Sequence, residues 1–419
     1  MIGGGWSRRV AEIQPFHVME VINAVKRLEA QGRHIIRLEV GEPDFPTPPP
    51  VLAAAHQSLE RDQTRYTAAM GVAELRQAVA DWYRRQYNVR IDPARIVITP
   101  GTSGAFLLAF GILLDPGDRV AISDPGYPCY PNMIRLLGGE PVPVAVGPEH
   151  DYQLSPKLLK PAVEKGLKAA LVTSPSNPTG TLISDAAMAE VITLVEGHGG
   201  YVISDEIYHG ITYERPARTA LEFSQEAIVI NGFSKFFAMT GWRLGWIIVP
   251  PSALRHVESL QQNLFISAPT LSQYAALAAF QCEESLKQQV QAFDRNRIFL
   301  VEQLRRLGFI IPVMPTGAFY VYADASQILQ RTGHPDTRSF CADLLEHSGV
   351  AVTPGLDFGQ HKARQHLRFS FATTMENVQE GVARLTAHLQ GFPAPTSNST
   401  GRGAKKLSPA RGGEKDSTR

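Results

Sequence analysis

The sequence has few of the features that would place the chain in a membrane, outside the cell or on a nucleic acid. Its three cysteines, Cys129, Cys282 and Cys341, are too far apart for a disulfide framework or a metal site, which favours a reducing cytoplasm. The twelve histidines form no metal-ligand spacing, so we expect no metal ion. No apolar run reaches the roughly 18 residues that a spanning helix needs, and the first residues lack the apolar stretch of a signal peptide. The formal net charge of +1 excludes a broad basic field for nucleic acid or a membrane surface.

Between residues 51 and 284, short apolar runs alternate with helical patterns. The runs "RIVITP", "RVAIS", "AALVTSP" and "YVISDE" are nearly continuous in Val, Ile and Leu, which is typical of strands buried on both faces. Strands that alternate with helices form mostly parallel sheets with right-handed crossovers. The sequence therefore predicts an α/β fold for this part of the chain.

The pattern changes after about residue 284. A long helical pattern is followed by short strand patterns at "FIIPV", "AFYVYAD", "GVAVTP" and "HLRFSFA", with two further helices among them. This mixture indicates a smaller α+β domain, which the N-terminal segment, with a helical pattern over 16–31, would join. The predicted division is an N-terminal segment (1–50), a large domain (51–284), a small C-terminal domain (285–391) and a tail (392–419).

The tail is rich in Pro, Gly, Ser and charged residues. Such a segment buries too little apolar area to offset the entropy lost on ordering. We therefore expect residues 392–419 to be disordered and to take no part in catalysis.

Polar residues follow several of the predicted strands. Ligands of open α/β sheets bind beyond the carboxyl ends of the strands. Thr102, Ser103 and Gly104 begin a helix after "RIVITP", where free N–H groups and the helix dipole favour a phosphate, although such residues are also ordinary helix caps. The further candidates at strand ends are Tyr127, Asn177, Asp205 and Tyr208.

Lys235 lies in "SKFFAMTGWRLGW", between two apolar runs that read as buried strands. A lysine cation is costly to bury, so this position indicates a cleft and a chemical task. Pyridoxal phosphate would satisfy the candidate residues together, because its aldehyde would meet Lys235 and its protonatable ring nitrogen would pair with Asp205. Its phosphate would face Thr102–Gly104, Ser234 and Arg243, its ring would stack on Tyr127, and its phenolic oxygen would face Asn177 and Tyr208.

Seven stretches, in this order, resemble the class I/II aminotransferases, which are fold-type-I pyridoxal-phosphate enzymes: "VGEPDFPTP", "YTAAMG", "SPSNPTG", "YVISDEIY", "FSKFFAMTGWRLGW", "GAFYVYAD" and "LRFSFA". The resemblance covers roughly residues 8–391. It implies a large domain with a mostly parallel seven-stranded sheet between helices, and a smaller α+β domain. It also implies transfer of an amino group between an L-amino acid and a 2-oxo acid.

The resemblance assigns a role to each candidate residue. Lys235 matches the lysine that forms the Schiff base, and Asp205 matches the acid that pairs with the pyridine nitrogen. Arg368, in "LRFSFA", matches the arginine that binds the substrate α-carboxylate. Tyr66 matches a tyrosine that reaches the cofactor phosphate of a neighbouring subunit, which implies a homodimer with shared active sites. The remaining matches are Tyr208 and Asn177 near the ring oxygen, Asn177 and the backbone of Gly41 at the substrate carboxylate, Ser234 and Arg243 at the phosphate, and Tyr127 against the ring.

Three other functions compete with this one. A C–S lyase or synthase of the same fold would share the lysine, aspartate and arginine. A regulator built on this fold would carry a DNA-binding domain in front of it, whereas about fifteen residues precede the first helical pattern. A structural protein would not need all three of these residues.

One position of the sequence indicates which class of substrate side chain the enzyme accepts. Aspartate- and prephenate-type relatives often carry a lysine where this chain has Ser103. The absence of this lysine favours an amino donor with an apolar or small side chain. Arg37 and Arg65 are the remaining candidates for binding a side-chain carboxylate.

Overall fold

The computed structural model of the protein describes residues 7–393. All but the first two residues of the predicted tail, 392–419, lie outside the described residues, as does the start of the N-terminal segment. Within residues 7–393, no helix combines the length and the apolar character that crossing a bilayer requires.

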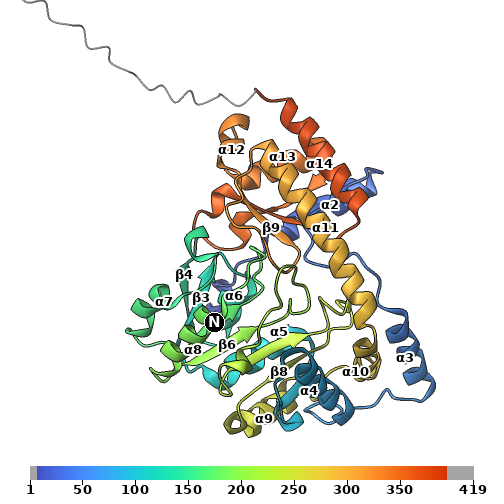
Figure 1. Ribbon diagram of the computed structural model, residues 1–419, viewed down its shortest axis with the longest axis vertical. Helices are drawn as coiled ribbons and strands as arrows, with labels where there is room; N and C mark the ends of the chain where they lie inside the picture. The colour runs from blue at the N-terminus through green and yellow to red at the C-terminus, as the bar shows by residue number, and fades with distance from the viewer. Residues whose placement is uncertain (1–6, 394–419) are drawn as a thin grey trace, which may run out of the picture.

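The larger part of the molecule is built on a seven-stranded sheet (Figure 1). The strand order is β2-β8-β7-β6-β5-β3-β4; β8 runs antiparallel to both of its neighbours, and the other pairs are parallel. This confirms the predicted fold class. The strands are β2 (Ile96–Thr99), β3 (Arg119–Asp124), β4 (Glu140–Ala145), β5 (Ala169–Thr173), β6 (Tyr201–Asp205), β7 (Ile228–Gly232) and β8 (Gly245–Ile248).

Helices cover both faces of this sheet, and the strand residues alternate between two apolar cores. In β2, Ile96 and Ile98 join one core, whereas Val97 joins the other. Strand β4 lies at the sheet edge and contains Pro141 and Pro143, whose missing N–H groups an edge strand tolerates. One face of the sheet carries α5 (Gly101–Leu113), α6 (Cys129–Leu136) and α9 (Leu254–Leu264). The other face carries α4 (Ala73–Tyr87), α7 (Pro156–Val163), α8 (Asp185–Glu196) and α10 (Thr270–Leu277). Helix α3 (Pro49–Glu60) packs on α10.

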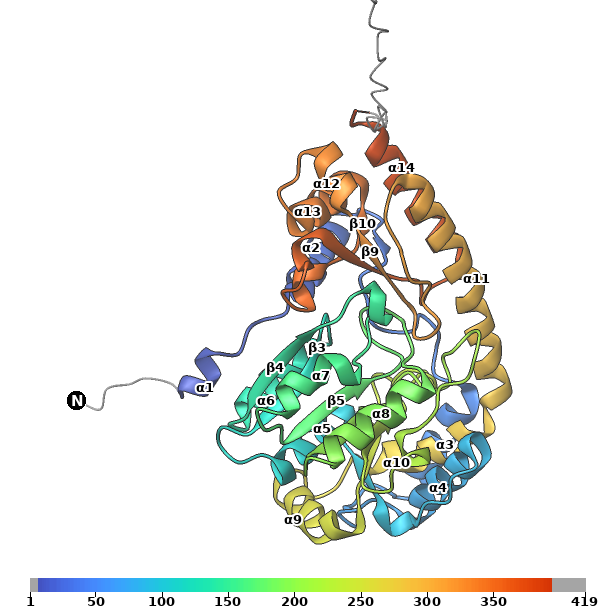
Figure 2. The ribbon, with the colours of Figure 1, turned by 60° about the vertical axis from the view of Figure 1, so that its left-hand side comes forward.

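The smaller part contains a three-stranded antiparallel sheet, β11-β12-β9, and a parallel pair, β1-β10. The N-terminal helix α2 (His17–Ala30) packs against β11 and the short helix η6 (Gly355–Asp357). Both views show the long helix α11 (Glu283–Leu307) running from the neighbourhood of α3 to α14 (Figures 1 and 2). The other elements are β1 (Ile36–Arg37), β9 (Tyr320–Asp324), β10 (Val350–Ala351), β11 (Thr353–Pro354), β12 (His366–Ser370), α12 (Ser326–Thr332), α13 (Thr337–Ser348) and α14 (Met375–Gln390).

The strand predicted at "FIIPV" is wrong: this stretch makes a single bridge, between Ile310 and Asp324. Pro312 has no N–H group with which to extend the ladder.

Figure 2 shows the first helix, α1 (Arg8–Ala11), away from the small sheet and beside α6, which it contacts. The N-terminal segment therefore touches both parts of the molecule.

Candidate active site

A cavity of ≈ 350 Å³ lies between the seven-stranded sheet and the smaller part of the molecule. It is at the carboxyl ends of β6 and β7, where a parallel sheet binds its ligands. Two predicted residues do not line it: Gly104 is buried under Pro100 and Phe265, and Tyr66 is 79% exposed elsewhere on the chain. The predicted residues that do line it are Gly41, Thr102, Ser103, Tyr127, Asn177, Asp205, Tyr208, Ser234, Lys235, Arg243 and Arg368.

Lys235 lies in the connection between β7 and β8, and its side chain reaches the cavity. Its Nζ atom donates a hydrogen bond of 2.5 Å to the carbonyl oxygen of Gly41. Burial, together with the positive charges of Arg368 and Arg243, lowers the pKa of Lys235 to about 8, while the negative charge of Glu42 opposes the shift. A usable fraction of neutral amine is therefore present near neutral pH, as nucleophilic and general-base lysines require.

Asp205 is the last residue of β6 and is buried. One carboxylate oxygen accepts a 2.5 Å hydrogen bond from the Tyr130 hydroxyl, and the other accepts one of 3.1 Å from the Ile207 N–H. Burial raises the pKa of Asp205 to about 6, while these hydrogen bonds and the charge of Lys235 lower it. Both of these hydrogen bonds come from neutral donors, so the carboxylate is suited to a cationic partner in the cavity.

Arg368 projects from β12, and contacts from three directions fix its guanidinium. Its Nη1 donates to Oδ1 of Asn177 at 3.0 Å, and its Nη2 donates to the carbonyl oxygen of Glu39 at 2.6 Å. The Cζ atom lies 4.4 Å from the ring centre of Tyr320 and 4.7 Å from that of Phe358. The Nε atom is buried and has no partner among the described residues. A planar, pre-oriented guanidinium with donor capacity to spare suits a carboxylate.

A second cluster of donors lies where α5 begins. Gly101 has φ +69°, and an added Cβ atom there would come within 2.7 Å of Nη2 of Arg243. Arg243 itself has φ 52°, a backbone conformation that costs energy in a residue other than glycine and often marks a functional site. Its Nη1 donates to the carbonyl oxygen of Thr240 at 2.9 Å. The guanidinium and the first N–H groups of α5 thus converge on one place, which suits an anion.

Two tyrosines in the site had no role in the sequence analysis. The Tyr320 hydroxyl lies 2.8 Å from that of Tyr208, and its ring packs against Arg368. Tyr130 holds Asp205 and packs edge-on against Tyr127, with ring centres 5.3 Å apart. Tyr320 lies in "GAFYVYAD", a stretch already singled out, and Tyr130 lies three residues after Tyr127, but the sequence pattern does not distinguish the tyrosine that lines the cavity from its neighbours.

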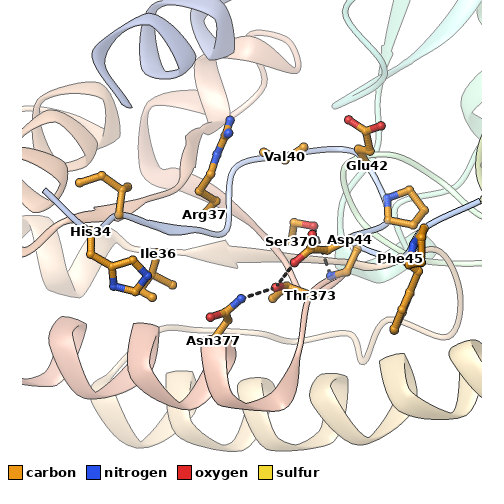
Figure 3. Close-up of a pocket in the computed structure, with 14 residues that line it drawn as sticks. His34, Ile36, Arg37, Val40, Glu42, Asp44, Phe45, Ser370, Thr373 and Asn377 are labelled. Carbon is orange, nitrogen blue, oxygen red and sulfur yellow. Dashed lines mark hydrogen bonds between the residues drawn. The ribbon is translucent and has the colours of Figure 1, made fainter. Parts of the chain in front are cut away.

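The segment 39–42 separates this cavity from a second one, of ≈ 640 Å³ (Figure 3). Val40 and Glu42 line both cavities. Figure 3 shows how the chain after Gly41 is fixed: Thr373 donates to Asp44 at 2.9 Å, and Asn377, in the first turn of α14, donates to Thr373 at 2.9 Å. These bonds hold the segment whose carbonyl groups contact Lys235 and Arg368.

The chain matches a known family over most of its length. The model of the family described as aminotransferase class I and II matches residues 33–385. The chain therefore belongs to the class I and II aminotransferase family, whose members generally use pyridoxal phosphate. This confirms the predicted family and the aminotransferase activity.

Individual relatives agree with this assignment. A valine–pyruvate aminotransferase of Mycobacterium tuberculosis is 40% identical over 90% of this chain and 97% of its own. An aspartate/prephenate aminotransferase of Thermus thermophilus is 36% identical over 91% of this chain and 97% of its own. The crystal structure of an aminotransferase from Mycobacterium tuberculosis superposes with a TM-score of 0.88 at 38% identity, covering 93% of this chain and 100% of that one.

Proposed function

We propose that this aminotransferase binds pyridoxal phosphate in the cavity between its two parts and takes L-amino acids with apolar or small side chains as amino donors. The observation that carries the substrate proposal is the set of cations in the cavity. Among the described residues that line it, the basic side chains are Lys235, Arg243 and Arg368. Each has a task that every substrate would share.

The residues present fit the cofactor. Gly101 leaves the space in which Arg243 approaches the start of α5, where Thr102, Ser103 and Ser234 complete a phosphate site. The buried carboxylate of Asp205 lacks a cation, which a protonated ring nitrogen would supply. Tyr127 would cover the ring, while Asn177 and Tyr208 would face its oxygen. Lys235 would hold the cofactor covalently, and Gly104, although outside the cavity, packs the first turn of α5 against Phe265.

When bound, pyridoxal phosphate supplies the aldehyde that receives the amino group and a ring that withdraws electrons from the substrate Cα. The chain supplies the proton transfers. Lys235, as a neutral amine, would take the proton from the substrate Cα as general base. It would then deliver the proton to the cofactor carbon as general acid. Asp205, as an anion, would stabilise the protonated ring nitrogen. Arg368 and Asn177 orient the substrate carboxylate.

The rest of the cavity favours an apolar substrate side chain. Phe16, Val18 and Ile22, from the start of α2, line it together with Phe358. Arg37 pairs with Glu39 at 3.0 Å and lines the second cavity, and Arg65 is exposed beside Asp62. Neither of these arginines lines the first cavity, so within the described chain no cation is left there for a side-chain carboxylate. The valine–pyruvate relative supports the same substrate class.

A screen of amino donors tests this proposal. The purified enzyme, supplied with pyridoxal phosphate, is assayed with each L-amino acid against 2-oxoglutarate and against pyruvate. We expect branched or small apolar donors to exceed aspartate in kcat/KM by about tenfold or more. Burying the unpaired side-chain carboxylate of aspartate costs more binding free energy than a small apolar donor loses by leaving part of the cavity unfilled. Aspartate as the best donor would contradict the proposal.

We also propose that the protein is a homodimer in which each subunit contributes to the other's site. Tyr66 lies in the connection between α3 and α4, and its ring is exposed, although tyrosine carries a large apolar surface. The interface of a two-fold dimer is self-complementary, so one loop given each way would complete both phosphate sites. Tyr66 would then bond the phosphate held by the other subunit.

Subunit complementation tests the shared site. Mixing Lys235→Ala with Tyr66→Phe subunits would create one site with both defects and one with neither. We therefore expect activity at low cofactor concentration to rise above that of either variant alone. The matched control mixes Tyr66→Phe with the double variant Lys235→Ala/Tyr66→Phe, which provides no intact site. Equal activity in both mixtures, or a fully active monomer in sedimentation, would refute the proposal.

The division of the chain at residues 50 and 284 stays a prediction. Its support is that the cavity lies between the two sheets, with α2 and β12 on one side and β6 and β7 on the other. We propose that residues 51–284 bind the cofactor, and that residues 1–50 and 285–391 close the substrate side. The cytoplasmic location also stays a prediction.

A further inference from the structure

Helix α2 forms an apolar wall of the cavity, but its own sequence does not cap it. Phe16, in the N-cap position, makes no side-chain hydrogen bond to the first turn. The first N–H groups of a helix have no partner within it and need an acceptor from elsewhere. The first turn also carries Val18, which lines the cavity. Whatever satisfies these N–H groups therefore also fixes the wall.

Asp357 supplies the missing cap from a distant part of the chain. One carboxylate oxygen accepts the N–H of His17 at 2.7 Å, and the other faces the N–H of Val18 at 3.4 Å. Asp357 ends η6 and is only 7% exposed. A carboxylate at a helix N-terminus also gains from the helix dipole.

Asp357 connects this wall with the substrate arginine. Its neighbour in the chain, Phe358, packs its ring 4.7 Å from Cζ of Arg368. Asp357 lines the cavity itself, yet both of its oxygens already face α2. Its carboxylate is therefore placed to position the helix rather than to react with a substrate.

We propose that Asp357 is a positioning residue that holds the first turn of α2 against the cavity and thereby sets the enzyme's affinity for apolar donor side chains. The part about donors rests on the proposed function. The part about α2 does not rest on it, because the hydrogen bonds between Asp357 and α2 are present without a substrate. The two parts can therefore fail separately.

Hydrogen exchange of the cofactor-loaded enzyme tests the anchoring of α2. In Asp357→Ala, we expect the amides of residues 17–22 to exchange about tenfold faster than in the wild type, as loss of a cap implies. Asp336 provides a matched control, because it caps α13 by accepting the N–H of Ser339 at 3.0 Å and lines neither cavity. Asp336→Ala should speed exchange in α13 and leave α2 unchanged. Wild-type protection of α2 in Asp357→Ala would overturn the proposal.

Steady-state kinetics test the effect on donors. If α2 contacts the donor side chain, Asp357→Ala should raise the KM for leucine or valine at least about fivefold more than the KM for alanine, with kcat changed less than KM. Asp357→Asn keeps an acceptor for His17 and should restore most of the affinity. Asp336→Ala should leave the KM ratio at its wild-type value. An equal change in KM for all donors, or no rescue by asparagine, would contradict a positioning role in donor selection.

Discussion

Lys235→Ala is expected to lower kcat by about a thousandfold or more while leaving the fold intact. Lys235 is the sole lysine that lines the cavity among the described residues, so no second amine can take over the proton transfer. Stability should change little, because burial lowers the pKa of Lys235 to about 8 and the fold therefore holds this cation at a cost. The measurements are single-turnover rates with an apolar donor and thermal unfolding of both proteins.

The control for this variant is a lysine outside the site. Lys160 is exposed on α7, and Lys160→Ala should keep both activity and stability. Lys235→Ala should still bind the cofactor through the phosphate and ring contacts, but without a covalent bond. Transamination by Lys235→Ala at the wild-type rate would show that the lysine has been assigned wrongly.

Arg368→Lys should weaken every substrate by a similar factor. Lysine lacks the planar fork, so the bonds to Asn177 and to the carbonyl of Glu39 cannot both be kept while a carboxylate is bound. Losing a bidentate contact with a buried partner costs roughly 2–4 kcal/mol. We therefore expect kcat/KM to fall about 30- to 1,000-fold for all donors. The α-carboxylate is common to all amino acids, which is why the loss should not depend on the side chain.

Arg297 is the matched control for Arg368. It is also buried, with a 2.7 Å hydrogen bond to the carbonyl oxygen of Pro315, but it does not line the cavity. Arg297→Lys should lower the melting temperature and leave the KM values in their wild-type order. A loss confined to one donor in Arg368→Lys would place Arg368 at the substrate side chain rather than at its carboxylate.

The sequence was most informative where local pattern and topology agree. Buried strands such as β6 and β7 are recognisable from composition alone, and parallel strands bring their carboxyl ends to one edge. Asp205 and Lys235 could therefore be placed near each other before any contact was known. The match to family motifs added Arg368, which comes from a different sheet, more than 130 residues further along the chain.

Contacts between distant segments could not be predicted in this way. Asp357 and His17 are separated by 340 positions, and no spacing rule links a helix start to a carboxylate so far along the chain. Tyr320 and Tyr322 are both buried in β9 and lie on the same face of the strand, so the alternation of side chains does not tell which of them lines the cavity, and only Tyr320 does. "FIIPV" has the composition of a strand, but strand pairing is a tertiary property that overrides such propensity.

The central claim, that Lys235 carries the cofactor, is tested most directly by chemical trapping. The enzyme is loaded with pyridoxal phosphate, treated with borohydride to make the bond to the lysine irreversible, digested and mapped by mass spectrometry. We expect the reduced cofactor on the peptide that contains Lys235 and on no other lysine peptide, with the signal absent in Lys235→Ala. The cofactor on a different lysine, or an unmodified Lys235 in a protein that remains active, would contradict the assignment.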